Sequence, residues 1–85
     1  MRTIFKYPLN VTDTQELWLP KGSQILDVQR QDTKIMLWAE IDPHAISEVH
    51  TIEFHGTGNP IEKGERKYIA TVQHYGLVWH VYERL

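Results

Sequence analysis

The sequence predicts an all-β protein of about seven short antiparallel strands, folded as a small sandwich or as a curled, barrel-like sheet. Three observations predict this fold class. Apolar and polar residues alternate with a period of two along most of the chain. Turn residues interrupt the alternation at short intervals. No segment has a sustained helical period, although one helical turn is allowed over Pro43–Glu48. The 85 residues are expected to form a single domain, 1–85.

Four strands are predicted in the N-terminal half: Thr3–Tyr7, Gln15–Leu19, Gln24–Gln29 and Lys34–Ile41. Pro8 is expected to stop the first strand, because proline lacks the backbone N–H that a ladder needs. Pro20-Lys21-Gly22 suits a tight connection after the second strand. Gln31-Asp32-Thr33 turns the chain between the third and fourth strands, which makes this pair the clearest predicted hairpin. Four residues of the fourth strand share an apolar face: Ile35, Leu37, Ala39 and Ile41.

Three strands are predicted in the C-terminal half: Val49–His55, Lys67–Gln73 and Leu77–Arg84. A polar loop, 61–66, precedes the second of these. The last two strands are expected to form a hairpin around His74-Tyr75-Gly76. Trp79 lies on the apolar face of the last strand, so it is the tryptophan expected in the core.

Composition excludes several classes of protein. The chain has no cysteine, which rules out disulfides and thiolate zinc sites. A domain of this size buries a smaller share of its surface than a larger domain does, so we expect a homo-oligomer. The formal net charge is −2 and the basic residues are scattered, which makes nucleic acid an unlikely partner. No apolar run has the length of a signal peptide or a membrane span, and we therefore expect a cytoplasmic protein without membrane contact.

Chemistry-bearing side chains do not form a recognisable catalytic or metal motif. His50 and His55 are five positions apart, so on a strand they point to opposite faces, and no metal site is expected. Serine occurs only at Ser23 and Ser47, neither in a nucleophile elbow. The acids of the strands, Glu53 among them, are expected on solvated faces. These observations favour a protein that is not an enzyme and has no cofactor.

The loop from Gly56 to Asn59 is the most distinctive local feature. Glycines on both sides of a threonine allow backbone N–H groups to converge on an anion such as phosphate. The four loop residues in this candidate site are Gly56, Thr57, Gly58 and Asn59. Arg66 and Lys67 follow and supply positive charge. A plain glycine-rich β-turn is the alternative, and the sequence leaves it open.

Aromatic residues are numerous for this length. Trp38 and Tyr82, with His80, are candidates for stacking on a nucleotide base. The same rings suit a core or a subunit interface equally well, because they offer large apolar surfaces with polar edges.

The chain resembles a family of small, poorly characterised bacteriophage proteins. Six segments carry the resemblance: Phe5–Leu9, Leu37-Trp38, Asp42-Pro43, Gly56–Ile61, Tyr68–Gln73 and Val78–Glu83. The resemblance implies phage origin and expression in a bacterial cytoplasm, and it supplies no catalytic residues.

The leading hypothesis is a non-catalytic phage protein that sequesters a small phosphorylated ligand. Small phage proteins of this kind are expected to bind the cyclic or cyclised nucleotide that signals infection and so to counteract bacterial defence. The alternative is a protein–protein interaction module, either an inhibitor of a host protein or a structural or regulatory phage component.

Overall fold

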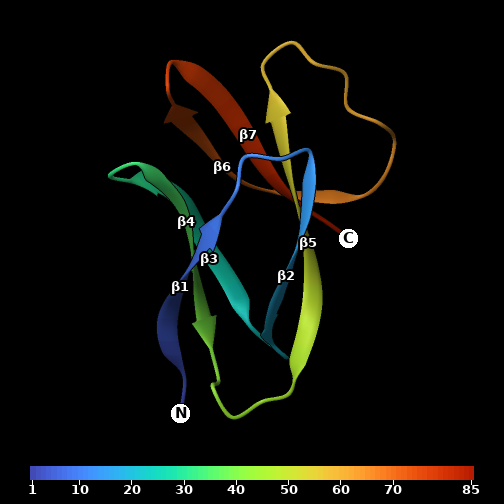
Figure 1. The fold of residues 1–85 in the computed structure, drawn as a ribbon. Coiled ribbons are helices and arrows are strands. Elements are labelled where there is room, and N and C mark those ends of the chain that lie inside the picture. The colour runs from blue at the N-terminus through green and yellow to red at the C-terminus, as the bar shows by residue number, and fades with distance from the viewer.

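The computed structural model describes residues 1–85 and confirms the all-β prediction, with seven antiparallel strands and no helix (Figure 1). The strands are β1 Thr3–Leu9, β2 Thr14–Pro20, β3 Gln24–Gln31, β4 Lys34–Ile41, β5 Ser47–Gly56, β6 Arg66–His74 and β7 Leu77–Arg84. The bounds of β4 and β7 match the predicted ranges to the residue. The other five strands are one or two residues longer at one end or both.

The strands form two sheets. One has three strands in the order β1-β4-β3, and the other has four in the order β2-β5-β7-β6. The two predicted hairpins, β3–β4 and β6–β7, are both present. β1 pairs with β4, and β2 with β5, because the chain passes from one sheet to the other, whereas β5 pairs with β7 because β6 takes the edge position of the same sheet. The result is a sandwich and not a closed barrel.

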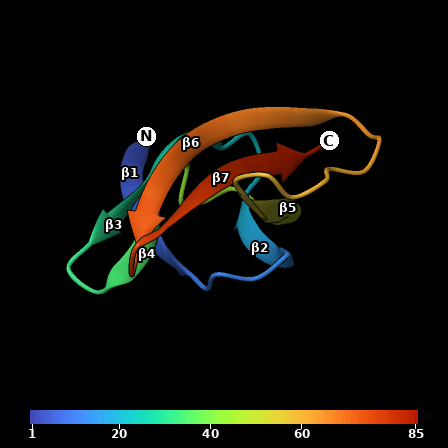
Figure 2. The same ribbon diagram turned by 90° about the horizontal axis from the view of Figure 1, so that it is seen from above.

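The two sides of the sandwich differ. On one side the edge strands β3 and β6 come close together, although no ladder joins them. On the other side β1 and β2 lie apart, connected by the chain that Figure 2 shows below them. The sandwich is therefore open along β1 and β2.

The structure differs from two local expectations. β1 continues through Pro8 to Leu9. Because β1 is an edge strand, its other side has no ladder that would need the backbone N–H that proline lacks. The allowed helical turn at Pro43–Glu48 is absent. The N–H of Ala45 donates to the carbonyl of Asp42 at 3.1 Å, which closes a β-turn, and the Asp42 carboxylate accepts from the N–H of His44.

One apolar core lies between the sheets, and every strand contributes to it. Its twelve buried residues are Leu9, Leu19, Val28, Ile35, Leu37, Ala39, Ile41, Ile52, Phe54, Ala70, Val72 and Val81. The predicted apolar face of β4 supplies four of them. Trp79 is partly buried and packs against this core, whereas Trp18 is exposed.

Local irregularities fit the sandwich. The edge strands β3 and β6 each contain a bulge, at Ile25/Asp27 and at Tyr68/Ala70. A bulge increases strand twist and discourages pairing with a foreign strand. The β6–β7 turn holds Tyr75 and Gly76 at φ of 50° and 77°, the left-handed pair that a two-residue hairpin requires.

The structure contains no helix long and apolar enough to cross a membrane.

Replacing a central core residue should destabilise the fold strongly. Leu37 is fully buried in the middle of β4, so Leu37→Ala leaves a cavity between the sheets. We expect it to lower the free energy of unfolding by about 3 kcal/mol, measured by urea denaturation. Leu26→Ala is the matched control, because Leu26 is exposed at the β3 bulge, and it should cost less than about 1 kcal/mol. Equal losses in the two variants would contradict the assigned core.

Candidate functional site

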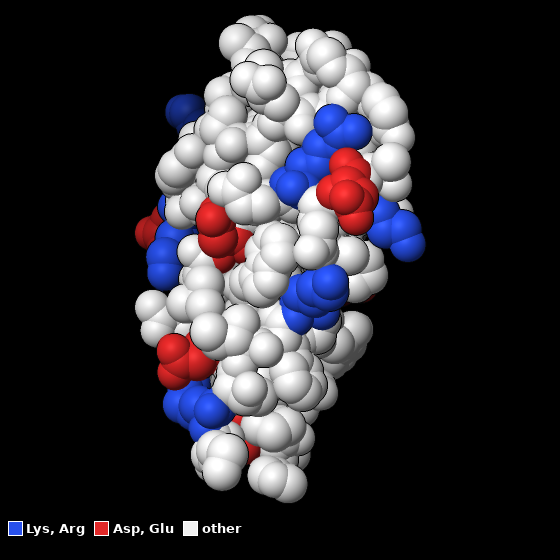
Figure 3. Space-filling view, turned by 90° about the vertical axis from the view of Figure 1, so that its left-hand side faces the viewer, with Lys and Arg blue, Asp and Glu red and all other residues white.

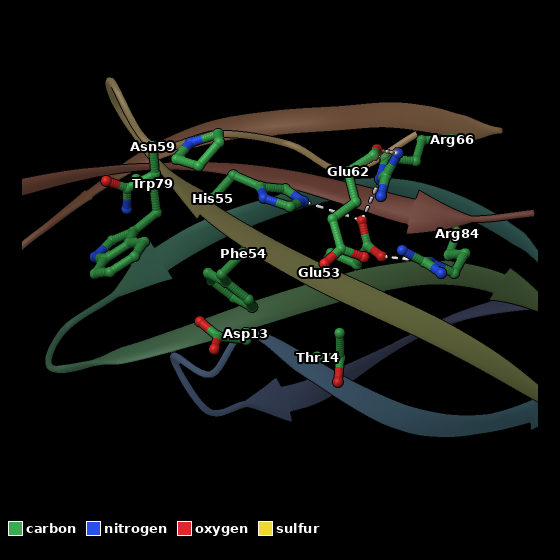
Figure 4. Close-up of a pocket in the computed structure, with 12 residues that line it drawn as sticks. Asp13, Thr14, Glu53, Phe54, His55, Asn59, Glu62, Arg66, Trp79 and Arg84 are labelled. Carbon is green, nitrogen blue, oxygen red and sulfur yellow. Dashed lines mark hydrogen bonds and ion pairs between the residues drawn. The ribbon is translucent and has the colours of Figure 1, made fainter. Parts of the chain in front are cut away.

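A buried carboxylate lies on the outer face of the four-stranded sheet, the face turned away from the core. Glu53 is only 1 % exposed, which corrects the expectation that it lies on a solvated face. Its Oε1 accepts hydrogen bonds from Nε of Arg66 at 2.5 Å and from Nε2 of His55 at 3.0 Å. Its Oε2 accepts from Nε of Arg84 at 2.6 Å (Figure 4).

The strand register brings these partners together. Arg66 on β6 lies directly across from Arg84 on β7, and β7 is the neighbour of β5, which carries Glu53. Burial by itself raises the pKa of Glu53, but the hydrogen bonds from His55, Arg66 and Arg84 lower it more. The net effect lowers its pKa from 4.5 to about 2. Glu53 is therefore charged at neutral pH, and it holds both guanidinium groups.

A cleft of about 370 Å³ adjoins this cluster. It opens because β2 begins at Thr14, opposite Glu53, so residues 54–56 of β5 pair with β7 on one side and have no strand on the β2 side. Its polar walls include Asp13, Glu53, Glu62, Arg66 and Arg84. The carboxylates of Asp13 and Glu62 make no hydrogen bond or ion pair. With three acids and two arginines, this cleft offers no net positive charge to a phosphate.

The predicted anion loop is a β-turn. The N–H of Asn59 donates to the carbonyl of Gly56 at 3.1 Å, and Gly58 adopts a φ of 86°. The N–H of Asn59 is therefore already used within the turn. The side chain of Thr57 lies 2.8 Å (Oγ1 to Nε2) from His80. The structure thus brings two predicted site residues, Thr57 and His80, into contact.

His80 belongs to a chain of hydroxyl contacts on the outer face of the four-stranded sheet. Its Nδ1 lies 3.1 Å from Oγ1 of Thr71, and that hydroxyl lies 2.7 Å from the hydroxyl of Tyr68. Tyr68 also packs edge to face against Tyr82, with ring centroids 5.5 Å apart. These contacts fix the turn after β5 onto β7 and leave both His80 nitrogens occupied.

The other predicted site residues are not gathered in one place. Arg66 is committed to Glu53 and also donates to the carbonyls of Glu62 and Gly64. Lys67 is exposed and lies opposite Glu83, on the other face of the sheet from Arg66. Trp38 lies in the three-stranded sheet, on its outer face.

A second cleft lies at one end of the sandwich, and we call it the Lys34 cleft. Its volume is about 330 Å³. Three connections meet there: the chain after β1, the β3–β4 turn and the end of β6. Its polar lining consists of Asn10, Thr33, Lys34 and His74, and no acid lines it.

Two polar groups of the Lys34 cleft have no hydrogen-bond partner. Lys34 makes no ion pair or hydrogen bond through its ammonium group. Nδ1 of His74 is buried without any hydrogen-bond partner, which is costly unless something else uses it. The His74 ring packs against the ring of Tyr75 at 4.3 Å between centroids, and the guanidinium of Arg30 lies 5.2 Å from the centre of the Tyr75 ring.

Outside the two clefts, acidic and basic side chains lie near one another on the surface. Figure 3 shows acidic and basic side chains interspersed over the face that it displays, with no continuous basic stripe. No three histidine, aspartate or glutamate side chains converge as a metal site would need.

Sequence reasoning missed the Lys34 cleft and the role of Glu53. A signal for Glu53 exists in the alternation, which places Glu53 and His55 on the same face of β5. No comparable signal exists for the cleft, because Asn10, Lys34 and His74 are far apart in the chain.

The chain belongs to the family described as Domain of unknown function (DUF7352), whose model matches residues 1–85. No curated protein and no solved structure matches it.

Stability should depend on pH through Glu53. Its folded pKa of about 2 lies below its ordinary value of 4.5, so its stabilising contribution is complete above pH 4.5 and is lost as the pH falls toward 2. We expect this loss to be about 3 kcal/mol. Glu53→Gln should remove that pH dependence and should be about 3 kcal/mol less stable than wild type at pH 7, because Arg66 loses its buried counter-charge.

Urea denaturation between pH 2 and 7 measures both effects. Glu65→Gln is the control, since the Glu65 side chain is exposed and makes no hydrogen bond or ion pair, and it should keep the wild-type pH profile. A Glu53→Gln variant as stable as wild type at pH 7 would refute the structural role of this carboxylate.

Proposed function

We propose that this chain is a non-catalytic binding protein that sequesters a small phosphorylated ligand, of the cyclic or cyclised nucleotide class. The observation that supports it best is the Lys34 cleft, where an unpaired ammonium group and other donors line a concave site without any acid. The proposal therefore assigns phosphate binding to this cleft and not to the Gly56–Asn59 turn.

Electrostatics favour the Lys34 cleft over the other cationic positions. Arg2 is paired with Glu40 at 2.7 Å, and Arg66 and Arg84 share Glu53. An arginine with an acidic partner has less net charge to offer an anion. Lys34 has no such partner, and Thr33 and Asn10 add a hydroxyl and an amide from the same cleft.

The side chains at the rim of the Lys34 cleft suit stacking on a nucleotide base. Tyr75 is 68 % exposed and follows His74 directly in the β6–β7 turn, so its ring is available for stacking. Arg30 lies against that ring and adds a second cation near the site. The cleft volume is at the lower end of the range for small-molecule sites, which favours a ligand of mononucleotide size.

The biological setting follows from the resemblance to small bacteriophage proteins. In that setting, sequestration of a signalling nucleotide in the bacterial cytoplasm counteracts the host's anti-phage defence. A binding protein acts by stoichiometry, so it needs no catalytic group.

A protein–protein interaction module is the second candidate. Exposed apolar side chains on the outer faces support it, with Trp18 next to Val49 as the clearest pair. Purification from bacteria distinguishes the two candidates, because the first should retain a nucleotide and the second a polypeptide.

Lys34→Gln should weaken nucleotide binding without weakening the fold. Removal of the ammonium group costs a charge-assisted hydrogen bond, so we expect the Kd to rise at least tenfold. Native mass spectrometry against a panel of cyclic and cyclised nucleotides measures the affinity, and thermal denaturation checks the fold. Bound nucleotide should keep its mass, since no turnover is proposed.

Lys21→Gln is the matched control, because Lys21 is an exposed lysine of the β2–β3 turn outside the cleft. It should bind as wild type does. If no nucleotide of the panel binds, or if both variants bind equally, the proposal fails and the interaction module takes its place.

A further inference from the structure

Two strand edges of the sandwich have no neighbour. β1 ends the three-stranded sheet and β2 ends the four-stranded sheet, and they lie apart on the open side (Figure 2). Unlike β3 and β6, neither contains a bulge. A regular, unpaired edge is a template for strand addition. Pro8 and Pro20 lie near the C-terminal ends of the two strands, which limits any addition to the residues before them.

The outward side chains of these strands are complementary. Ile4 on β1 and Trp18 on β2 are apolar yet 56 % and 61 % exposed. Lys6 follows Ile4 on the same face of β1, and its ammonium group contacts only the side-chain oxygen of Gln31. Glu16 precedes Trp18 on the same face of β2, and its carboxylate makes no contact. Each edge therefore presents one charge without an oppositely charged partner beside one exposed apolar side chain.

We propose that β1 of one copy adds antiparallel to β2 of a second copy. A single register aligns Lys6 with Glu16 and Ile4 with Trp18, both on the outer faces. The same register aligns Phe5 with Leu17 on the inner faces, so the alternation of both strands is preserved. Opposite charges and apolar residues directly across a ladder stabilise strand pairing.

Pairing between identical edges is less favourable. When β1 pairs with β1 of a second copy, the central Lys6 side chains approach each other. When β2 pairs with β2 about its central Leu17, each Glu16 faces Trp18, so no ion pair forms. Like charges across a ladder are destabilising, so charge selects the pairing of β1 with β2.

The contact joins two different edges, and both edges border the same open side of each copy. Such a contact is either reciprocal, which closes a two-fold dimer, or repeats in a ring or chain. It also covers apolar surface that a domain of this size leaves open. The inference goes beyond the proposed ligand site, and no ligand is needed for it.

Charge reversal tests the pairing. Native mass spectrometry and light scattering across a range of protein concentrations should show wild type as an oligomer. Lys6→Glu and Glu16→Lys should each weaken association about fivefold, because each turns an attraction into a repulsion. The double variant Lys6→Glu/Glu16→Lys should restore wild-type association. Trp18→Ser should weaken association about tenfold through loss of the apolar contact.

Lys63→Glu is the matched control, since Lys63 is exposed in the loop before β6, and it should associate as wild type does. Circular dichroism melting verifies that every variant folds. A wild-type protein that stays monomeric overturns the inference and leaves the edges to a foreign strand. Association that is insensitive to both reversals, or that the double variant fails to restore, also overturns it. These outcomes are read from assembly alone, so failure of this inference is distinguishable from failure of nucleotide binding at Lys34.

Discussion

All seven strands supply side chains to one core, and this core must be covered from both sides by a chain of only 85 residues. β4 provides four of the twelve buried side chains, so the three-stranded sheet is built around it. To cover the other side, the chain changes sheet after β1, after β2 and after β4. These passages separate β1 from β2 and leave both edges free. They also bring the connection after β1 to the end of the sandwich where Lys34 lies.

The alternation of apolar residues predicts the strands well wherever one face is buried. β4 shows this with four core residues, and β7 shows it with Val81 in the core and Trp79 packed against it. The prediction fails where the cause is not local. Pro8 is compatible with β1 only because β1 is an edge, and edge position depends on the sheet order. Glu53 looks like a solvated acid until Arg66 and Arg84 arrive from other strands. The Lys34 cleft depends likewise on turns that meet only in three dimensions.

Whether a cationic side chain has an acidic partner decides if it stabilises the fold or is available to bind a ligand. Arg66 is only 8 % exposed in its side chain and is bound to a buried carboxylate, so its removal affects the fold before it affects any ligand. The sequence presents Arg66 and Lys67 as equivalent neighbours, but the two residues lie on opposite faces of β6. Lys34 is the first residue of β4, and no sequence motif distinguishes it. In the structure it is the cation without an acidic partner in a cleft free of acids.

The open edges and the Lys34 cleft share one segment of chain. Asn10 and Val11 line the cleft, and they connect β1 directly to β2. If β1 and β2 each pair with a neighbouring copy, both ends of this connection are held by strands that no longer have a free edge. A binding site with a constrained wall loses less conformational entropy when its ligand binds. Under the two proposals, assembly through the edges would favour ligand binding in the Lys34 cleft, even though no residue of the second copy has to enter the cleft.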